Sequence, residues 1–95
     1  MVLSEIDSTN AFAVREIRSF AGPTWVLGLR QTAGRGRRGR AWADLVGNFA
    51  GTLVLTPTDE TPDRLAQRSF MAALGLYDAL GTVVGQAAPF ALKWP

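Results

Sequence analysis

The sequence contains neither cysteine nor histidine. Without thiols, neither a disulfide framework nor a thiolate metal site can form. Without imidazole, Ser-His-Asp and Cys-His catalysis are both excluded, together with the commonest protein ligand of zinc. Two classes of nucleophilic enzyme and two kinds of covalent or metal framework are therefore ruled out before any motif is considered.

Long apolar runs are also missing. No apolar stretch approaches the length of a membrane span. The N-terminal segment Met1–Glu5 has no basic region followed by an apolar core, which a signal peptide requires. We therefore expect a cytoplasmic protein without a membrane partner. With 95 residues, 47% of them hydrophobic and 19% charged, the chain has the composition of one small globular domain of modest stability.

Basic and acidic residues nearly balance, at ten and eight, which leaves a net charge of +2. Four of the ten cations nevertheless lie in a single glycine-spaced segment, Gly34–Arg40. Glycine lets the backbone approach a ligand closely, and guanidinium groups offer fixed donors to phosphate and carboxylate oxygens. Such a local concentration predicts a focused anion site rather than a general nucleic-acid surface.

Hydrophobic periodicity and turn residues predict strands and helices in the order β-α-β-loop-β-α-β. The expected strands are Val2–Ile6, Thr24–Leu29, Thr52–Thr56 and Phe90–Trp94. The first helix is expected to start at the N-cap cluster Asp7–Asn10 and to end at Gly22-Pro23, and the second to run from Thr61-Pro62-Asp63 to Gly81. A basic loop from Thr32 to Asn48 follows the second strand. This order predicts an α+β fold with a mixed or antiparallel sheet and packed helices.

The same periodicity predicts which side chains are buried. Two helical stripes are expected to face the core, one formed by Ala11, Val14, Ile17 and Ala21, the other by Leu65, Phe70, Leu74, Tyr77 and Leu80. Trp25 and Trp94 stand on apolar strands and are expected in the core, whereas Trp42 stands in the loop. A hydroxyl from Thr61 is expected to cap the second helix.

Residues Gly34–Gly39 satisfy the dinucleotide pattern G-x-G-x-x-G. In a dinucleotide-binding fold this loop opens directly into a helix whose N-terminus holds the pyrophosphate. Residues 40–47 have weak helical periodicity and soon meet Gly47, so we interpret the match as a false positive. Two other interpretations of the loop remain open from residue types alone. It could bind RNA, with Trp42 stacking on a base, or form a solvated turn.

Three segments, in order, carry a more specific signal. Asp7-Ser8-Thr9-Asn10, the run from Arg30 to Trp42, and Lys93-Trp94-Pro95 together closely resemble the catalytic domain of biotin protein ligases. The resemblance covers Asp7 to Pro95 and implies a fold like that of class II aminoacyl-tRNA synthetases and biotin ligases. It identifies residues 1–95 as the N-terminal part of such a domain, with the remainder absent after Pro95.

The resemblance implies activation of biotin by ATP to biotinyl-5'-AMP, followed by transfer to a lysine of a biotin carboxyl carrier domain. Biotin and ATP are then substrates, Mg²⁺ is expected, and a homodimer is left open. The alternative within the same superfamily is a lipoate or octanoate ligase or transferase, against which the arginine-rich loop and the Lys-Trp-Pro element argue. No DNA-binding domain precedes the first strand, so the chain resembles the single-function ligases.

Site residues follow from the matching positions. Lys93 and Arg37 resemble the catalytic cations, and Trp42 the aromatic residue that closes over the intermediate. Biotin or its adenylate is expected to contact Ser8, Thr9, Asn10, Gln31, Gly34, Arg35, Gly36, Arg37, Trp42 and Lys93. Residue types alone favour a plain helix N-cap for the hydroxyl cluster, and both roles can hold, since one residue can cap the helix while its neighbour binds the ligand. Arg38 and Arg40 rank lower, as anchors of the loop or solvent-facing residues.

The sequence departs from the family pattern after Trp42, where the usual Ser-Pro is missing although Gly47 and Asn48 remain. The family also continues past Lys-Trp-Pro with further biotin and ATP contacts. We therefore expect residues 1–95 alone to perform no ligation. Because the loop has little apolar surface and several charges of one sign, we also expect it to be mobile without ligand and to order over biotinyl-AMP.

Overall fold

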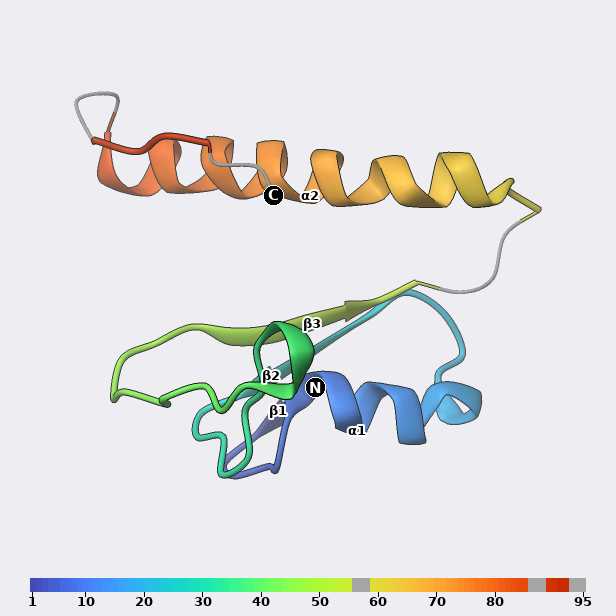
Figure 1. The fold of residues 1–95 in the computed structure, drawn as a ribbon, viewed down its shortest axis with the longest axis vertical. Coiled ribbons are helices and arrows are strands. Elements are labelled where there is room, and N and C mark those ends of the chain that lie inside the picture. The colour runs from blue at the N-terminus through green and yellow to red at the C-terminus, as the bar shows by residue number, and fades with distance from the viewer. Residues whose placement is uncertain (56–58, 86–88, 93–95) are drawn as a thin grey trace. The chain divides into compact units, whose positions relative to one another are not determined.

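The computed structural model describes residues 1–55, 59–85 and 89–92, and the chain divides into two compact units, Met1–Pro57 and Thr58–Pro95. The first unit contains three strands and a helix, and the second a long helix (Figure 1). The elements are β1 (Val2–Leu3), α1 (Thr9–Arg15), β2 (Thr24–Gly28), β3 (Ala50–Val54) and α2 (Pro62–Val84). Two single 3-10 turns, Ile17–Ser19 and Arg37–Gly39, complete the first unit.

The three strands form one mixed sheet in the order β1-β2-β3. Strand β1 runs parallel to β2, with Val2 opposite Leu27, and β3 runs antiparallel to β2, with Leu53 opposite Trp25. The predicted α+β class with a mixed sheet is therefore confirmed. The parallel pair requires a crossover between its strands, and α1 supplies it.

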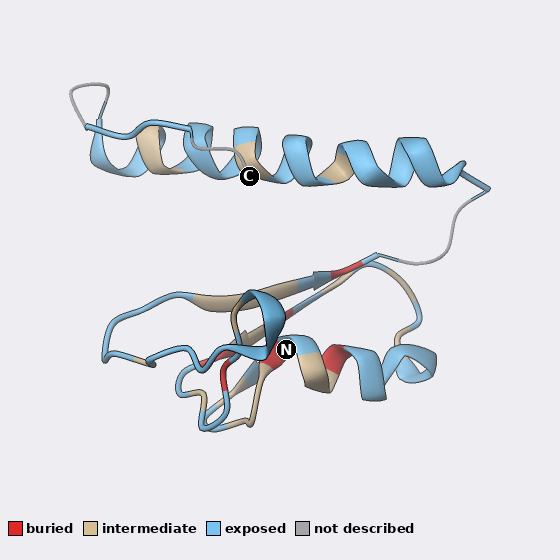
Figure 2. Cartoon of the chain, viewed as in Figure 1, coloured by how far each residue is buried: buried red, intermediate tan, exposed pale blue. Residues whose placement is uncertain are grey.

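Helix α1 covers one face of this sheet, and the buried hydrophobic residues lie at that contact (Figure 2). Thr9 and Ala13, four residues apart on one helix face, are 4% and 5% exposed. From the sheet, Val26 and Val54 complete the core, with Val26 fully buried. Leu3, Phe12 and Phe20 pack around these residues. The core is small, as expected for a unit of this size.

In the first unit, two predictions about burial were wrong. Val14 and Ile17 are 66% and 48% exposed, because α1 turns its Thr9–Ala13 row toward the sheet instead. Trp25 is 56% exposed, because side chains alternate along β2 and Val26 takes the inward position. The Trp25 ring contacts Phe49 edge-on, at 6.5 Å between ring centroids.

Several element boundaries also differ from the prediction. Strand β1 stops at Leu3, and Ile6 rejoins the sheet as an isolated bridge to Gln31. Helix α1 ends at Arg15, well before Gly22-Pro23. Strand β3 starts two residues early and ends at Val54, so Leu55 is outside it, while Thr56 lies outside the described residues. Pairing with a neighbouring strand decides these ends, and single-sequence patterns do not contain that information.

The second unit consists mainly of α2, which continues three residues past the predicted end at Gly81. Thr61 is its N-cap and Pro62 its first residue, as predicted, but the Thr61 hydroxyl makes no capping hydrogen bond. The predicted apolar stripe is not buried, since no residue of α2 is in the buried class. Phe90–Leu92, expected to begin the last strand, are in no strand, since strand structure requires a hydrogen-bonded partner. Lys93, Trp94 and Pro95 lie outside the described residues.

Candidate functional site

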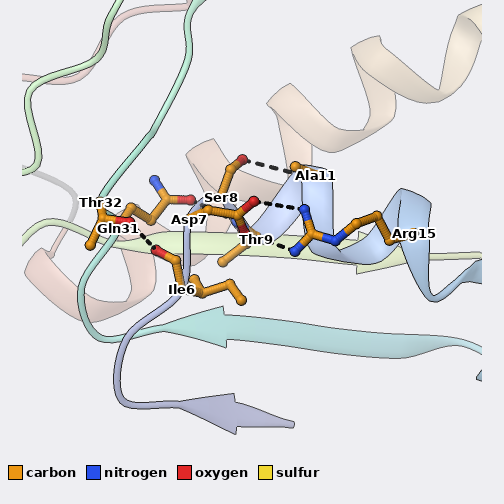
Figure 3. Close-up of polar contacts among 8 residues, drawn as sticks. All are labelled: Ile6, Asp7, Ser8, Thr9, Ala11, Arg15, Gln31 and Thr32. Atoms are coloured by element: carbon orange, nitrogen blue, oxygen red, sulfur yellow. Dashed lines mark hydrogen bonds and ion pairs between the residues drawn. The ribbon is translucent and has the colours of Figure 1, made fainter.

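The candidate site forms where residues 6–7, just before α1, pair with residues 30–33, which follow the C-terminal end of β2. The Ile6 amide donates to the Arg30 carbonyl at 3.0 Å, and the Thr32 amide donates to the Ile6 carbonyl at 2.9 Å. One residue further, the Ala33 amide donates to the Asp7 carbonyl at 2.8 Å. These parallel contacts bring the hydroxyl cluster next to the start of the basic loop, although the two are more than twenty residues apart in sequence (Figure 3).

Ser8 is the N-cap of α1, and its Oγ accepts a hydrogen bond from the Ala11 amide at 3.3 Å. Asp7, just before it, forms a two-pronged ion pair with Arg15, with N–O distances of 2.6 and 3.0 Å (Figure 3). The hydrogen bond from Arg15, followed by one from the Ser8 backbone, lowers the pKa of Asp7 to about 2. The carboxylate in turn raises the pKa of Arg15. The helix start is thus held by its cap and by this surface pair.

Gln31 links the helix start to the sheet. Its Oε1 accepts hydrogen bonds from the Thr9 amide at 2.8 Å and from the Thr9 hydroxyl at 3.2 Å. The hydroxyl of Thr52, on β3, donates to Thr9 Oγ1 at 3.0 Å. Because a backbone N–H must face an acceptor, the Gln31 carbonyl oxygen points to Thr9 and Nε2 points the other way. No acceptor contacts Nε2 among the residues that the structure describes.

The basic loop closes on itself as a short hairpin. The Gly36 amide donates to the Arg40 carbonyl at 2.8 Å, and the Trp42 amide donates to the Gly34 carbonyl at 2.9 Å. At the tip, Arg38 has a left-handed backbone, with φ 58° and ψ 29°, and Gly39 follows with φ 70°. No helix begins within residues 40–49, which confirms that the G-x-G-x-x-G match is a false positive.

A pocket of about 500 Å³ opens on this hairpin, within the size range of small-molecule sites. Three arginines and the Trp42 ring dominate its lining, which consists of Gly36, Arg37, Arg38, Arg40, Ala41 and Trp42. None of the four loop arginines forms an ion pair with a carboxylate in residues 1–55, 59–85 or 89–92. The pocket therefore presents uncompensated positive charge beside an aromatic face.

Gly34 lies between the pocket and a polar cluster formed by the side chains of Ser8, Thr9 and Gln31. It is buried, and a Cβ atom there would lie 3.1 Å from Gln31 Nε2 and 3.6 Å from Trp42 Cβ. A larger residue there would require the Gln31 amide or the hairpin to shift by a few tenths of an ångström. The pocket and the polar cluster are therefore adjacent parts of one site.

The structure brings most of the predicted residues together. Ser8, Thr9 and Gln31 form the polar cluster, Gly34 lies between this cluster and the pocket, and Gly36, Arg37 and Trp42 line the pocket. Arg35 is exposed on the hairpin, where its backbone forms an isolated antiparallel β-bridge with Ala41. Asn10 is exposed and lines a different groove, between α1 and β3. Lys93 lies outside the described residues.

Arg38 and Arg40, which the sequence ranked lower, are exposed and line the pocket together with Arg37. Sequence reasoning gave no role to Asp44, whose Oδ2 accepts a hydrogen bond from the Gln31 backbone amide at 2.6 Å. A signal for Asp44 was present. Between Glu16 and Asp59 it is the single acidic residue, in a segment otherwise rich in arginine.

The described residues contain no group of three or more acidic side chains that could hold a metal ion. The described residues therefore offer no cluster of three acids to the Mg²⁺ expected from the resemblance, an ion that usually binds through one or two carboxylates together with substrate phosphates. Within the same residues, neither helix combines the length and apolarity that a membrane crossing requires.

Comparison with known proteins gives two findings. The model of the Biotin/lipoate A/B protein ligase family matches residues 2–95. A curated relative from Paracoccus denitrificans, described as a biotin–[acetyl-CoA-carboxylase] ligase, is 54% identical over 94 residues. That match covers 99% of this chain and 39% of the relative. No solved structure matches the chain.

Proposed function

Because the chain belongs to the Biotin/lipoate A/B protein ligase family, we propose that it is part of an enzyme that joins biotin to a carrier protein. The observation that carries this proposal is the pocket lined by three arginines, none of which forms an ion pair within the described residues, close to the side-chain amide of Gln31. Residues 1–95 would form the first part of the catalytic domain, and the cytoplasm is the proposed location. The whole reaction belongs to a longer protein, since the chain spans 39% of its relative.

The polar cluster suits the head group of biotin. A ureido ring offers two N–H donors and one carbonyl acceptor. The Ser8 hydroxyl can supply an acceptor at the start of α1, and Gln31 Nε2 can supply a donor. Lipoate carries a dithiolane ring without such groups, and a site built from polar partners discriminates strongly against ligands that leave them unpaired. This chemistry and the named relative both favour biotin over lipoate.

The arginine pocket suits the first reaction step. A carboxylate oxygen of biotin attacks the α-phosphorus of ATP, the bond to the bridging oxygen breaks, and pyrophosphate leaves with the bonding electrons. Two anions must approach each other, so cations aimed at them lower the barrier by offsetting their repulsion. Arg37, with Arg38 and Arg40 in the same pocket, can supply this charge. Trp42 can cover the adenylate with its ring.

In the second step the neutral ε-amine of a carrier lysine attacks the acyl carbon of biotinyl-AMP. The bond from this carbon to the phosphate oxygen breaks, AMP leaves, and the amine loses a proton as the amide forms. Lys93, which lies outside the described residues, is proposed from the resemblance to act in the first step, on the biotin carboxylate and the α-phosphate. The acceptor is a carrier domain of a biotin-dependent carboxylase.

A hybrid protein tests the proposal. It consists of residues 1–95 joined to the part of the Paracoccus denitrificans ligase that lies beyond the match. We expect biotin-dependent exchange of pyrophosphate into ATP and biotinylation of a carrier, with lipoate inactive. Arg37→Ala should lower the exchange rate by roughly one to two orders of magnitude, since one charged donor is lost. Lipoate-dependent exchange, or full activity of a folded Arg37→Ala hybrid, would contradict the proposal.

A further inference from the structure

Asp44 stands out in the basic loop. It is the single acid among residues 17–58, and the only half-buried residue of the exposed stretch 41–49. Nothing in the proposed chemistry requires a negative charge beside an anion pocket, because such a charge repels phosphate and carboxylate. Its presence therefore needs a structural explanation.

The carboxylate is held by a backbone amide and not by the arginines around it. Its Oδ2 accepts the Gln31 N–H at 2.6 Å, a short, charge-assisted hydrogen bond. Asp44 forms no ion pair with an arginine within the described part of the chain. Because its charge is directed to Gln31, the arginines of the pocket remain available to an anionic ligand.

This bond ties both ends of the loop together. Gln31 lies just before the hairpin, where the chain leaves the sheet. Asp44 lies just after it, two residues beyond Trp42. The pair is thirteen residues apart, and the whole arginine hairpin lies between them. Gln31 is thus held at two points, its side chain by Thr9 and its backbone by Asp44.

We propose that Asp44 is a positioning residue, which holds Gln31 so that its Nε2 stays against Gly34 and beside the Trp42 wall of the pocket. Binding of the polar head group of the acyl substrate depends on this position of Gln31 Nε2. The phosphate end depends on the arginines instead. This inference rests on the proposed function, because it assigns Gln31 Nε2 to the biotin ureido ring.

The test compares three variants of the hybrid protein. Asp44→Ala removes the acceptor, Asp44→Asn keeps an acceptor oxygen without the charge, and Asp59→Ala removes an exposed acid elsewhere as a control for net charge. Binding of biotin and of AMP is measured by calorimetry. Exchange of the Gln31 backbone amide with deuterium is followed by NMR in the absence of ligand.

Asp44→Ala should weaken biotin binding about tenfold, the effect of losing one hydrogen bond to a charged group, and leave AMP binding unchanged. Gln31 amide exchange should accelerate in the same variant. Asp44→Asn should recover most of both properties, and Asp59→Ala should match the wild type. Equal weakening for biotin and AMP, or unchanged biotin affinity with a folded variant, would overturn the positioning role.

The two proposals fail in different ways. If the wild-type hybrid bound no biotin, the proposed function would be wrong, and the role of Asp44 toward biotin would fall with it. If the wild type bound biotin and Gln31 exchange were unchanged in Asp44→Ala, the proposed function would stand and the role of Asp44 would be wrong.

Discussion

At the scale of single residues, two glycines of the basic loop illustrate how the absence of a side chain shapes the candidate site. Gly34 is buried between Gln31 and Trp42, with no room for a methyl group at ordinary contact distance from the Gln31 amide. Gly39, by contrast, has open space around it but a positive φ of 70°. Two glycines of one loop are therefore required for different reasons, the first for close approach and the second for backbone geometry.

Gly34→Ala should weaken binding of a non-hydrolysable biotinyl-AMP analogue to the hybrid protein. The new Cβ lies 3.1 Å from Gln31 Nε2 and pushes the amide out of place. Overpacking of this kind costs about 1–3 kcal/mol, which weakens binding on the order of tenfold to a hundredfold. Gly22→Ala is the control, because nothing lies within 4 Å of a Cβ there. Equal affinities of the two variants would show that Gly34 does not limit the site.

The Asp7–Arg15 pair predicts how the helix start responds to acid. Arg15 lowers the pKa of Asp7 to about 2, below the usual value near 3.9. A lowered pKa means that the pair stabilises the fold above about pH 4, and that this contribution is lost as the pH falls toward 2. An NMR titration of the Asp7 carboxyl measures the shift. In Arg15→Gln the pKa should return toward its usual value, and an unchanged pKa would contradict the assignment.

At the scale of elements, the arginine hairpin is the part of the first unit that forms the pocket. Two backbone hydrogen bonds close it, and a left-handed Arg38 turns its tip. The left-handed conformation costs a residue other than glycine roughly 1–2 kcal/mol. An arginine is tolerated at the tip because the bonds on both sides hold the turn.

Two substitutions of Arg38 separate backbone geometry from charge. Arg38→Asn and Arg38→Val both remove the cation, but asparagine adopts the left-handed region readily and a β-branched residue does not. Hydrogen exchange of the Gly36 and Trp42 amides reports closure of the hairpin. Exchange in the valine variant should be about tenfold faster than in the asparagine variant. Equal exchange rates in the two variants would mean that the left-handed backbone at residue 38 does not control closure of the hairpin.

Helix α1 packs one row of residues against the sheet, whereas no residue of α2 is in the buried class. Helix α1 buries a Thr9–Ala13 row against Val26 and Val54, with a threonine hydroxyl satisfied by Gln31 and Thr52. The helical spacing of Val14 and Ile17 indicated the other side of this helix. Periodicity describes which residues share a face, but the sheet decides which face it covers.

At the scale of the whole molecule, the chain matches its family from residue 2 to residue 95 but spans 39% of a curated relative. We predict that residues 1–95 alone transfer no biotin to a carrier, whereas the hybrid protein does. Both are assayed with ATP, biotin and carrier, with circular dichroism to show that each is folded. Biotinylation by the 95-residue chain alone would contradict this prediction and show that the described site is sufficient.

Much of the site was predictable from the sequence because its signals are local. Hydroxyls before a helix, glycines among arginines, and alternating apolar residues indicate caps, an anion loop and strands without any knowledge of partners. These signals predicted the α+β class, the order of elements as far as α2, a helix cap at Ser8 and an anion loop at Gly34–Arg40. The assignment of Ser8–Asn10 and Gly34–Trp42 to one site rested on the family resemblance.

Tertiary structure decided what those segments do together. The orientation of the Gln31 amide follows from Thr9, twenty-two residues away, and its backbone is held by Asp44, thirteen residues further along. The exposure of Trp25 follows from which face of the sheet α1 covers. Such contacts join residues that are distant in sequence, and each depends on the folded position of its partner. The sequence by itself therefore determined the chemical groups of the candidate site, and the fold determined which of them lie next to one another.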